Sequence, residues 1–203
     1  MSITNYSELQ TAVLNWSARG DTAFTSKVPD FIRLGEERIW RNLRLDRMIQ
    51  FADLTIVSGQ NWVALPDDWA EFDTLYITDT GKPKKLEYRS YDALLEQDEG
   101  VGRYYYTIKG ARLVYGLTPS SDTAISTTYF QRLDLLATTS TNWILTNHPS
   151  VYLYSALLEG AVYAKNPAKV GEYGTLYDKA IDETMTADRA AKVSGSRLRM
   201  VAR

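Results

Sequence analysis

Cysteine is absent from the sequence, and histidine occurs once, as His148. The lack of cysteine excludes disulfide bonds, thiolate metal sites, iron–sulfur clusters and cysteine nucleophiles. A single histidine excludes, within one subunit, the zinc and iron sites that need several imidazoles. No stretch of about 18 apolar residues is present to span a bilayer. The first residues also lack the basic and apolar segments of a secretory signal, so we expect a cytoplasmic chain with no membrane partner.

Basic charge is not in excess either, because 23 lysines and arginines face 25 acidic residues, for a net charge of −2. No global positive field therefore attracts the whole chain to nucleic acid. Residues 189–203 are the exception, since they carry a net charge of +5 and leave −7 on the rest of the chain. Within them apolar residues alternate with arginines, as in a strand that is added to the edge of a partner's sheet.

We expect residues 189–203 to form an extended tail that docks on a partner, because a short mixed segment of this kind orders on binding. The alternative is a frayed, solvated chain end. The residues expected to dock are Arg189, Lys192, Arg197, Leu198, Arg199, Met200, Val201 and Arg203.

Apolar residues spaced three or four apart predict helices at both ends of the chain. The first expected helix has a face made of Tyr6, Leu9, Val13 and Trp16. The second opens at residues 26–29 with Ser26 as its cap, and its apolar face is Phe31, Ile32, Leu34, Ile39 and Leu43. Residues 151–164 are apolar nearly all round, so this helix must be covered on most sides. Asn166 and Pro167 end it, and a last helix with a stripe of Val170, Tyr173, Tyr177, Ile181 and Thr184 follows.

The middle of the chain has the period of two that is typical of strands. A hairpin is expected around the turn at residues 58–61, and further strands at 72–78, 83–88, 103–108, 111–116 and 122–131. Ser90 is expected to cap a short helix, and residues 134–146 to form a polar loop. The sequence therefore predicts an α+β fold: a helical bundle of residues 1–43 and 147–188, an inserted antiparallel β sandwich or barrel of residues 44–146, and the tail 189–203.

No set of residues with catalytic spacing stands out, and we expect no catalytic, cofactor or metal site. His148 lies at a helix start without a neighbouring nucleophile motif, which favours a capping or surface role. The carboxylate pairs Glu36/Glu37, Asp67/Asp68 and Asp98/Glu99 are most simply solvated charges. Alternation along Tyr104, Tyr105 and Tyr106 places at least half of this cluster in the core.

Four stretches of the sequence resemble the head–tail adaptor (connector) proteins of tailed bacteriophages, the type that forms a ring beneath the portal. They are Tyr6-Ser7-Glu8-Leu9-Gln10 with Val13 and Trp16; Phe31 to Arg44; Leu65-Pro66-Asp67-Asp68-Trp69; and Thr141 to Thr146 running into Pro149 and Tyr152 to Ala161. Together, and in this order, they extend over nearly the whole chain.

The resemblance implies a structural virion protein of the head–tail neck, assembled in the host cytoplasm and without catalytic residues or cofactors. Family members form a closed, commonly dodecameric ring, bind the portal protein through C-terminal segments and offer a platform to tail or nozzle proteins. The genome passes through the ring without sequence-specific binding. Such a ring needs two different contact patches per subunit, for which the charged helix residues Glu36, Glu37, Arg38 and Arg41 are candidates.

Two other functions stay open at the level of the sequence. One is a virion-associated enzyme acting on carbohydrate or peptidoglycan with a carboxylate pair such as Glu71 and Asp73. The other is a monomeric binding module whose tyrosine-rich β segment stacks on a ligand.

Overall fold

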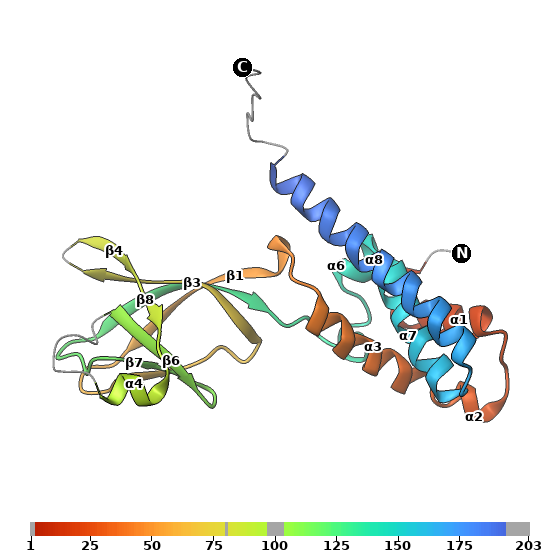
Figure 1. The fold of residues 1–203 in the computed structure, drawn as a ribbon, viewed down its shortest axis with the longest axis horizontal. Helices are drawn as coiled ribbons and strands as arrows, with labels where there is room; N and C mark the ends of the chain where they lie inside the picture. The colour runs from red at the N-terminus through yellow and green to blue at the C-terminus, as the bar shows by residue number, and fades with distance from the viewer. Residues whose placement is uncertain (1–2, 80, 97–103, 194–203) are drawn as a thin grey trace, which may run out of the picture. The chain divides into compact units, whose positions relative to one another are not determined.

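The computed structural model describes residues 3–79, 81–96 and 104–193 (Figure 1). The chain divides into two compact units. Met1–Asp46 and Leu133–Arg203 form the helical unit, and Arg47–Arg132 form the β unit. The chain therefore leaves the helical unit once and returns to it once, and the fold is α+β.

The helical unit contains α1 (Tyr6–Ser17), α2 (Thr22–Thr25) and α3 (Val28–Asn42) from the first segment of the chain. After the β unit come α5 (Leu136–Thr139), α6 (Trp143–Asn147), α7 (Pro149–Tyr163) and α8 (Pro167–Val193). A 3-10 turn at Asp46–Met48 precedes the first strand. Asn5 caps α1, since its side-chain oxygen accepts a 3.0 Å hydrogen bond from the backbone N–H of Glu8.

Helix α7 is the centre of this unit, and it packs against α1, α3, α6 and α8 (Figure 1). Its buried residues include Val151, Tyr152, Leu153, Ala156 and Leu157, which point to different sides of the helix. The prediction that this apolar segment is covered on most sides is therefore confirmed. The predicted stripe of α8 is confirmed as well, since Tyr173, Tyr177, Ile181 and Thr184 are buried.

Helices α3 and α7 approach closely at Gly35. A Cβ atom added to Gly35 would lie 2.6 Å from the side-chain oxygen of Ser155 and 3.2 Å from the backbone nitrogen of Ala156. Only a residue without a side chain fits this crossing, because the interior is close-packed. The missing side chain of Gly35 thus lets the charged helix α3 lie against the apolar helix α7.

Several helix predictions are wrong in detail. Trp16 and Leu34 are 54% and 47% exposed, because the buried stripes of α1 and α3 pass beside them. Ser26 does not cap α3, whose N-cap is Lys27 without a side-chain hydrogen bond. The expected loop 134–146 contains α5 and α6, which bury Leu136, Ile144 and Leu145. Helix α8 continues to Val193, so residues 189–193 are helical and not extended.

The β unit holds two four-stranded sheets. The first sheet has the order β1 (Ile49–Ile56), β8 (Thr123–Gln131), β3 (Trp69–Asp79), β4 (Lys82–Lys85), and all its pairs are antiparallel. The second has the order β2 (Trp62–Ala64), β7 (Arg112–Tyr115), β6 (Tyr105–Lys109), β5 (Glu87–Tyr88). This sheet is mixed, because β5 and β6 run parallel. Both sheets are open, so the barrel, one of the two predicted architectures, is wrong, and the parallel pair departs from the predicted antiparallel arrangement.

The two sheets of the β unit share one apolar core. Leu54, Ile56, Leu75, Ile77 and Ile125 come from the first sheet and pack with Leu113 and Tyr115 of the second. Burial alternates along β8, where Ile125, Thr127 and Tyr129 are buried, as the sequence predicts. The helix α4 (Tyr91–Leu95) begins at Ser90, whose hydroxyl accepts a hydrogen bond from the N–H of Ala93 and confirms the predicted cap.

The predicted hairpin around residues 58–61 is wrong, because its two strands belong to different sheets. Strand β1 pairs over its whole length with β8, whereas Trp62 pairs with Val114 of β7. The turn residue Ser58 donates its N–H to the carboxylate of Asp122, a bond that anchors the crossing between the sheets. The predicted pairing of residues 105–109 with 112–115 is confirmed, and Gly110 takes the positive φ of 61° that its turn requires.

Candidate functional site

Two regions carry the residues that the sequence singles out. The first is the charged side of α3, with Glu36, Glu37, Arg38 and Arg41. The second is the C-terminal end of α8, with Arg189 and Lys192. Both regions belong to the helical unit.

Glu36 faces the interior and not the solvent. It is 2% exposed, and its carboxylate accepts a 2.8 Å hydrogen bond from the backbone N–H of Leu136. Burial raises the pKa of the Glu36 carboxyl, although the Leu136 hydrogen bond and the charge of Arg33 oppose this shift. The expectation that Glu36 is a solvated charge is therefore wrong. Its spacing explains this, because Glu36 lies four residues after Ile32 and three before Ile39 on the buried stripe.

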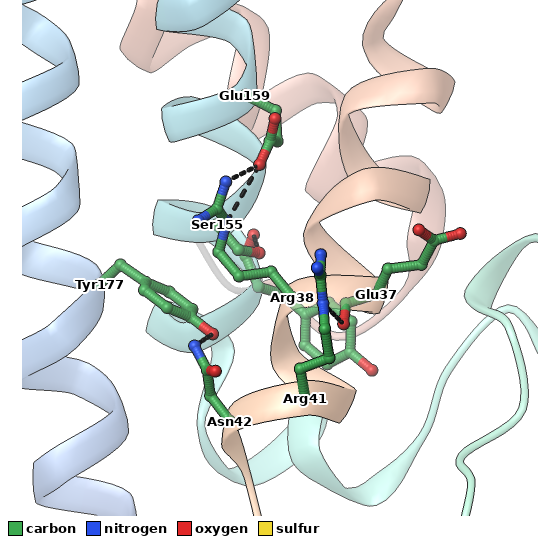
Figure 2. A network of polar contacts seen from close by, with 8 residues as sticks. Glu37, Arg38, Arg41, Asn42, Ser155, Glu159 and Tyr177 are labelled. Atoms are coloured by element: carbon green, nitrogen blue, oxygen red, sulfur yellow. Dashed lines mark hydrogen bonds and ion pairs between the residues drawn. The ribbon is translucent and has the colours of Figure 1, made fainter.

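Arg38 reaches across to α7 (Figure 2). Its guanidinium nitrogens Nε and Nη2 both donate to Oε1 of Glu159, with Nε at 3.0 Å. The Glu159 side chain is 14% exposed and that of Arg38 37%, so the pair is partly sheltered from water. Nearby, the side-chain amide of Asn42 donates to the hydroxyl of Tyr177 on α8 at 3.3 Å. These bonds tie α3 to α7 and α8.

Among the described residues, the hydrogen bonds and ion pairs of Glu37 and Arg41 stay within α3. The carboxylate of Glu37 pairs with Arg33 one turn earlier at 3.3 Å, and Arg41 Nε donates to the backbone oxygen of Glu37 (Figure 2). These contacts are all within α3. Of the four predicted contact residues on α3, Glu37 and Arg41 therefore present their polar groups away from α7.

The end of α8 is held by the segment that leaves α3. Asp46 donates its backbone N–H to the carboxylate of Asp188 at 3.0 Å, and its own carboxylate pairs with Lys192 at 2.9 Å. Helix α8 is thus fastened within its last described turns. Residues Arg197, Leu198, Arg199, Met200, Val201 and Arg203 of the predicted tail lie outside the described residues.

The residues weighed for catalysis lie in different units of the chain, His148 in the helical unit and Glu71 and Asp73 in the β unit. His148 lies half-buried between α6 and α7 and caps neither helix through its side chain. Glu71 and Asp73 lie on β3, where the carboxylate of Asp73 accepts a 2.9 Å hydrogen bond from the hydroxyl of Thr128. Among the described residues, no three acidic or histidine side chains gather to hold a metal ion, and no helix could cross a membrane.

The tyrosine cluster is divided between core and surface. Tyr104 and Tyr106 pack against the core of the β unit, which confirms the predicted alternation. Tyr106 contacts Phe72 and Tyr88 edge-on, and burial raises its pKa. Tyr105 points to the other side of the sheet, where the guanidinium of Arg89 stacks on it. The three tyrosines therefore do not form one stacking platform.

A second cluster escaped the sequence analysis and lies on the sheet β2-β7-β6-β5. On the side turned away from the core, three cations each stack on an aromatic ring: Arg89 on Tyr105 at 4.7 Å, Lys109 on Tyr91 at 3.5 Å, and Arg112 on Trp62 at 3.8 Å. We call these six residues the cationic face. These residues are spread over positions 62–112 of the sequence, and the pairing of the strands brings them to one side of the sheet. In the sequence itself, the alternation of Arg112 with the buried Leu113 is the feature that indicates an outward-facing cation.

Comparison with known proteins gives one family. The family model described as SU10 adaptor protein matches residues 4–200 of this chain. A search of curated proteins found no match.

Proposed function

Because this chain belongs to the SU10 adaptor protein family, a family of phage structural adaptors, we propose that it forms the ring between the portal and the tail of a phage particle. In this proposal identical subunits close into a ring, commonly a dodecamer, and the portal protein lies on one side of it. Tail or nozzle proteins bind the other side. The protein joins other virion proteins and catalyses no reaction.

In the proposed architecture the two halves of the helical unit, expected at residues 1–43 and 147–188, form one bundle, and the β domain, expected at residues 44–146, is inserted between them. The compact units of the structure change at Asp46 and Leu133, so α5 and α6 belong with the bundle. The observation that supports it is the single departure of the chain from the helical unit and its single return. Contacts such as Arg38 with Glu159 link the first segment of this unit to the second. A frame closed from both ends of the chain is suited to carry load between two partners.

The contact with the portal is assigned to the C-terminal segment. Residues 189–203 carry a charge of +5 against −7 on the remaining chain, and three of these charges, Arg197, Arg199 and Arg203, follow the end of α8. An acidic groove on the portal would attract and orient this positive segment. Leu198 and Met200 would supply buried apolar area. The segment follows a helix whose end is fastened through Asp46 to Asp188 and Lys192, so it starts from a fixed point. Repeated around a ring, a weak contact becomes durable through effective concentration.

The ring would also carry the genome without binding it specifically. A channel lined by subunits with a negatively charged body repels DNA phosphates weakly and lets the duplex slide, whereas a basic channel would hold it. On α3, Glu37 and Arg41 remain the candidates for a subunit contact, since in the described part of the chain their polar contacts lie within α3 itself. The finished ring would belong to the neck of the virion, after assembly in the host cytoplasm.

Removal of residues 194–203 tests the portal contact. This truncation keeps Lys192 and its pair with Asp46, so we expect an unchanged circular dichroism spectrum and melting temperature. Attachment to filled heads should be lost. Attachment of the truncated protein at the wild-type level would refute the assignment.

Two matched variants separate charge from burial in this test. Replacement of Arg197, Arg199 and Arg203 by alanine removes three positive charges, and we expect slower attachment that becomes less sensitive to salt. Replacement of Leu198 and Met200 by serine keeps all the charges, and we expect normal encounter but faster release.

A further inference from the structure

The cationic face has features that its own subunit does not account for. Lys109 and Arg112 lie directly opposite each other across β6 and β7, and like charges in this position destabilise a sheet. Within the described part of the chain, no ion pair involves Arg89, Lys109 or Arg112. Each cation lies on a half-buried ring, so its charge is held in place at the surface.

The opposite sheet of the same unit carries acidic groups around an exposed ring. Phe51 on β1 is 85% exposed, a burial state unusual for a phenylalanine. Its register neighbour Thr128 donates to the carboxylate of Asp73 at 2.9 Å. Two pairs along the same strands, Ser126 donates to the carboxylate of Asp53 at 2.8 Å. We call Phe51, Asp53, Asp73 and the 38% exposed Tyr76 the acidic face.

The two faces point away from each other. Both sheets turn their other side to the common core, where Ile125 next to Ser126 and Leu113 next to Arg112 are fully buried. Successive residues of a strand point to opposite sides, so Ser126 and Arg112 lie on the two outer surfaces. Within one subunit the faces therefore cannot meet, whereas in two copies they can.

The charge on each face is not entirely of one sign. Glu87 pairs with Tyr105 at the edge of the cationic face, and Lys85 pairs with Tyr76 at the edge of the acidic face. Both lie on edge strands, β5 and β4. Lys109 and Arg112 of the cationic face, and Asp53 and Asp73 of the acidic face, lie on other strands than these two edge residues.

We propose that the cationic face of one copy of this chain docks on the acidic face of the next copy. Lys109 and Arg112 would meet Asp53 and Asp73, and the ring of Phe51 would be buried against the aromatic side chains beneath the cations. The contact uses two different patches, so it is heterologous and propagates in one direction until the copies close. Charge complementarity orients such a contact, and burial of aromatic area stabilises it.

This inference deepens the proposed ring and rests on it for its biological setting, but its test needs no portal. Two charge-reversal variants of the full chain are used. D53K/D73K makes the acidic face basic, and K109E/R112E makes the cationic face acidic. Both pairs of residues lie on the outer side of a sheet, and circular dichroism verifies that each variant is folded.

Self-association is measured by sedimentation velocity over a range of protein concentrations at low ionic strength. We expect the wild type to exceed the subunit mass and each variant alone to associate at least about tenfold more weakly. In an equimolar mixture the reversed faces complement each other, so association should return. The truncated chain that lacks residues 194–203 should associate like the wild type.

Other results would overturn the inference: a wild type that stays at the subunit mass throughout, single variants that associate normally, or a mixture that does not recover. Another such result is binding of the wild type to duplex DNA that K109E/R112E abolishes without changing self-association, since it would assign the cationic face to phosphates. If the wild type attaches to heads in any of these cases, the proposed function stands while the docking contact fails. If the mixture recovers but no chain attaches to heads, the contact stands and the adaptor role fails.

Discussion

Glu36 does for α5 what a capping residue normally does for its own helix. The N-terminus of α5 has no side-chain cap, and its first N–H, that of Leu136, donates to the Glu36 carboxylate from a position 100 residues earlier in the chain. The contact joins α3 to the segment that follows the β unit. It satisfies a buried N–H at the cost of a buried acid.

The raised pKa of Glu36 gives a pH-dependent prediction. The folded state holds the proton more tightly than the unfolded chain, so the stability that the wild type derives from this group is present below the unfolded pKa and is lost as pH rises through the raised folded pKa. In Glu36→Gln an uncharged oxygen still accepts the bond from Leu136. We therefore expect E36Q to match the wild type in urea unfolding at acidic pH, and to exceed it by on the order of 1 kcal/mol at neutral pH.

Glu36→Ala is the control for this measurement. It leaves the Leu136 N–H without a partner, and we expect a loss of about 1–3 kcal/mol at every pH. An E36Q protein that is less stable than the wild type at neutral pH and equal to it at acidic pH would contradict the assignment.

At the scale of elements, the crossing of α3 and α7 depends on Gly35. Gly35→Ala places a methyl group within 2.6 Å of the Ser155 hydroxyl, so we expect a destabilisation of about 1–3 kcal/mol in chemical unfolding. Gly171→Ala is the matched control, because nothing lies within 4 Å of its added Cβ in α8, and alanine should stabilise that helix by about 0.5–1 kcal/mol. Ser155→Ala in the Gly35→Ala background should recover part of the loss. Equal effects of the two glycine substitutions would contradict the close crossing.

Elements with a strong local period were predictable from the sequence, and those fixed by distant partners were not. The apolar residues of α7 and the alternation of β8 specify both elements without reference to the rest of the chain. The turn after β1 looks like a hairpin locally, but eight residues of β1 pair with β8, which lies far along the chain. Helices α5 and α6 have only four and five residues, which is too short for a helical period to show in the sequence, although Leu136 and Leu145 are fully buried.

The error in the predicted site came from the type of one residue and not from its spacing. Glu36 has the position of a core residue on α3, and its charge alone suggested solvent. The family itself was recognised because its motifs are local stretches of sequence, and the family match confirms it. To predict the cationic face, one would have to know how its strands pair and where α4 lies, and no single stretch of the sequence contains this information.

At the scale of the whole molecule, two kinds of contact and the connection between them are assigned to separate parts of the chain. The C-terminal segment binds the portal in our proposal, the two outer faces of the β unit bind neighbouring copies, and the helical unit connects these functions through one chain. Because the segment and the faces share no residue, their variants should fail in different assays. The chain truncated after Val193 should no longer attach to filled heads but should still self-associate, whereas K109E/R112E should weaken self-association.

The most direct test of the central claim is the native mass of portal rings before and after mixing with this protein. The account predicts an increase in whole multiples of the 23.0 kDa subunit that saturates at a closed ring, and no increase with the chain that lacks residues 194–203. A portal mass that stays unchanged in the presence of excess wild-type protein would contradict it.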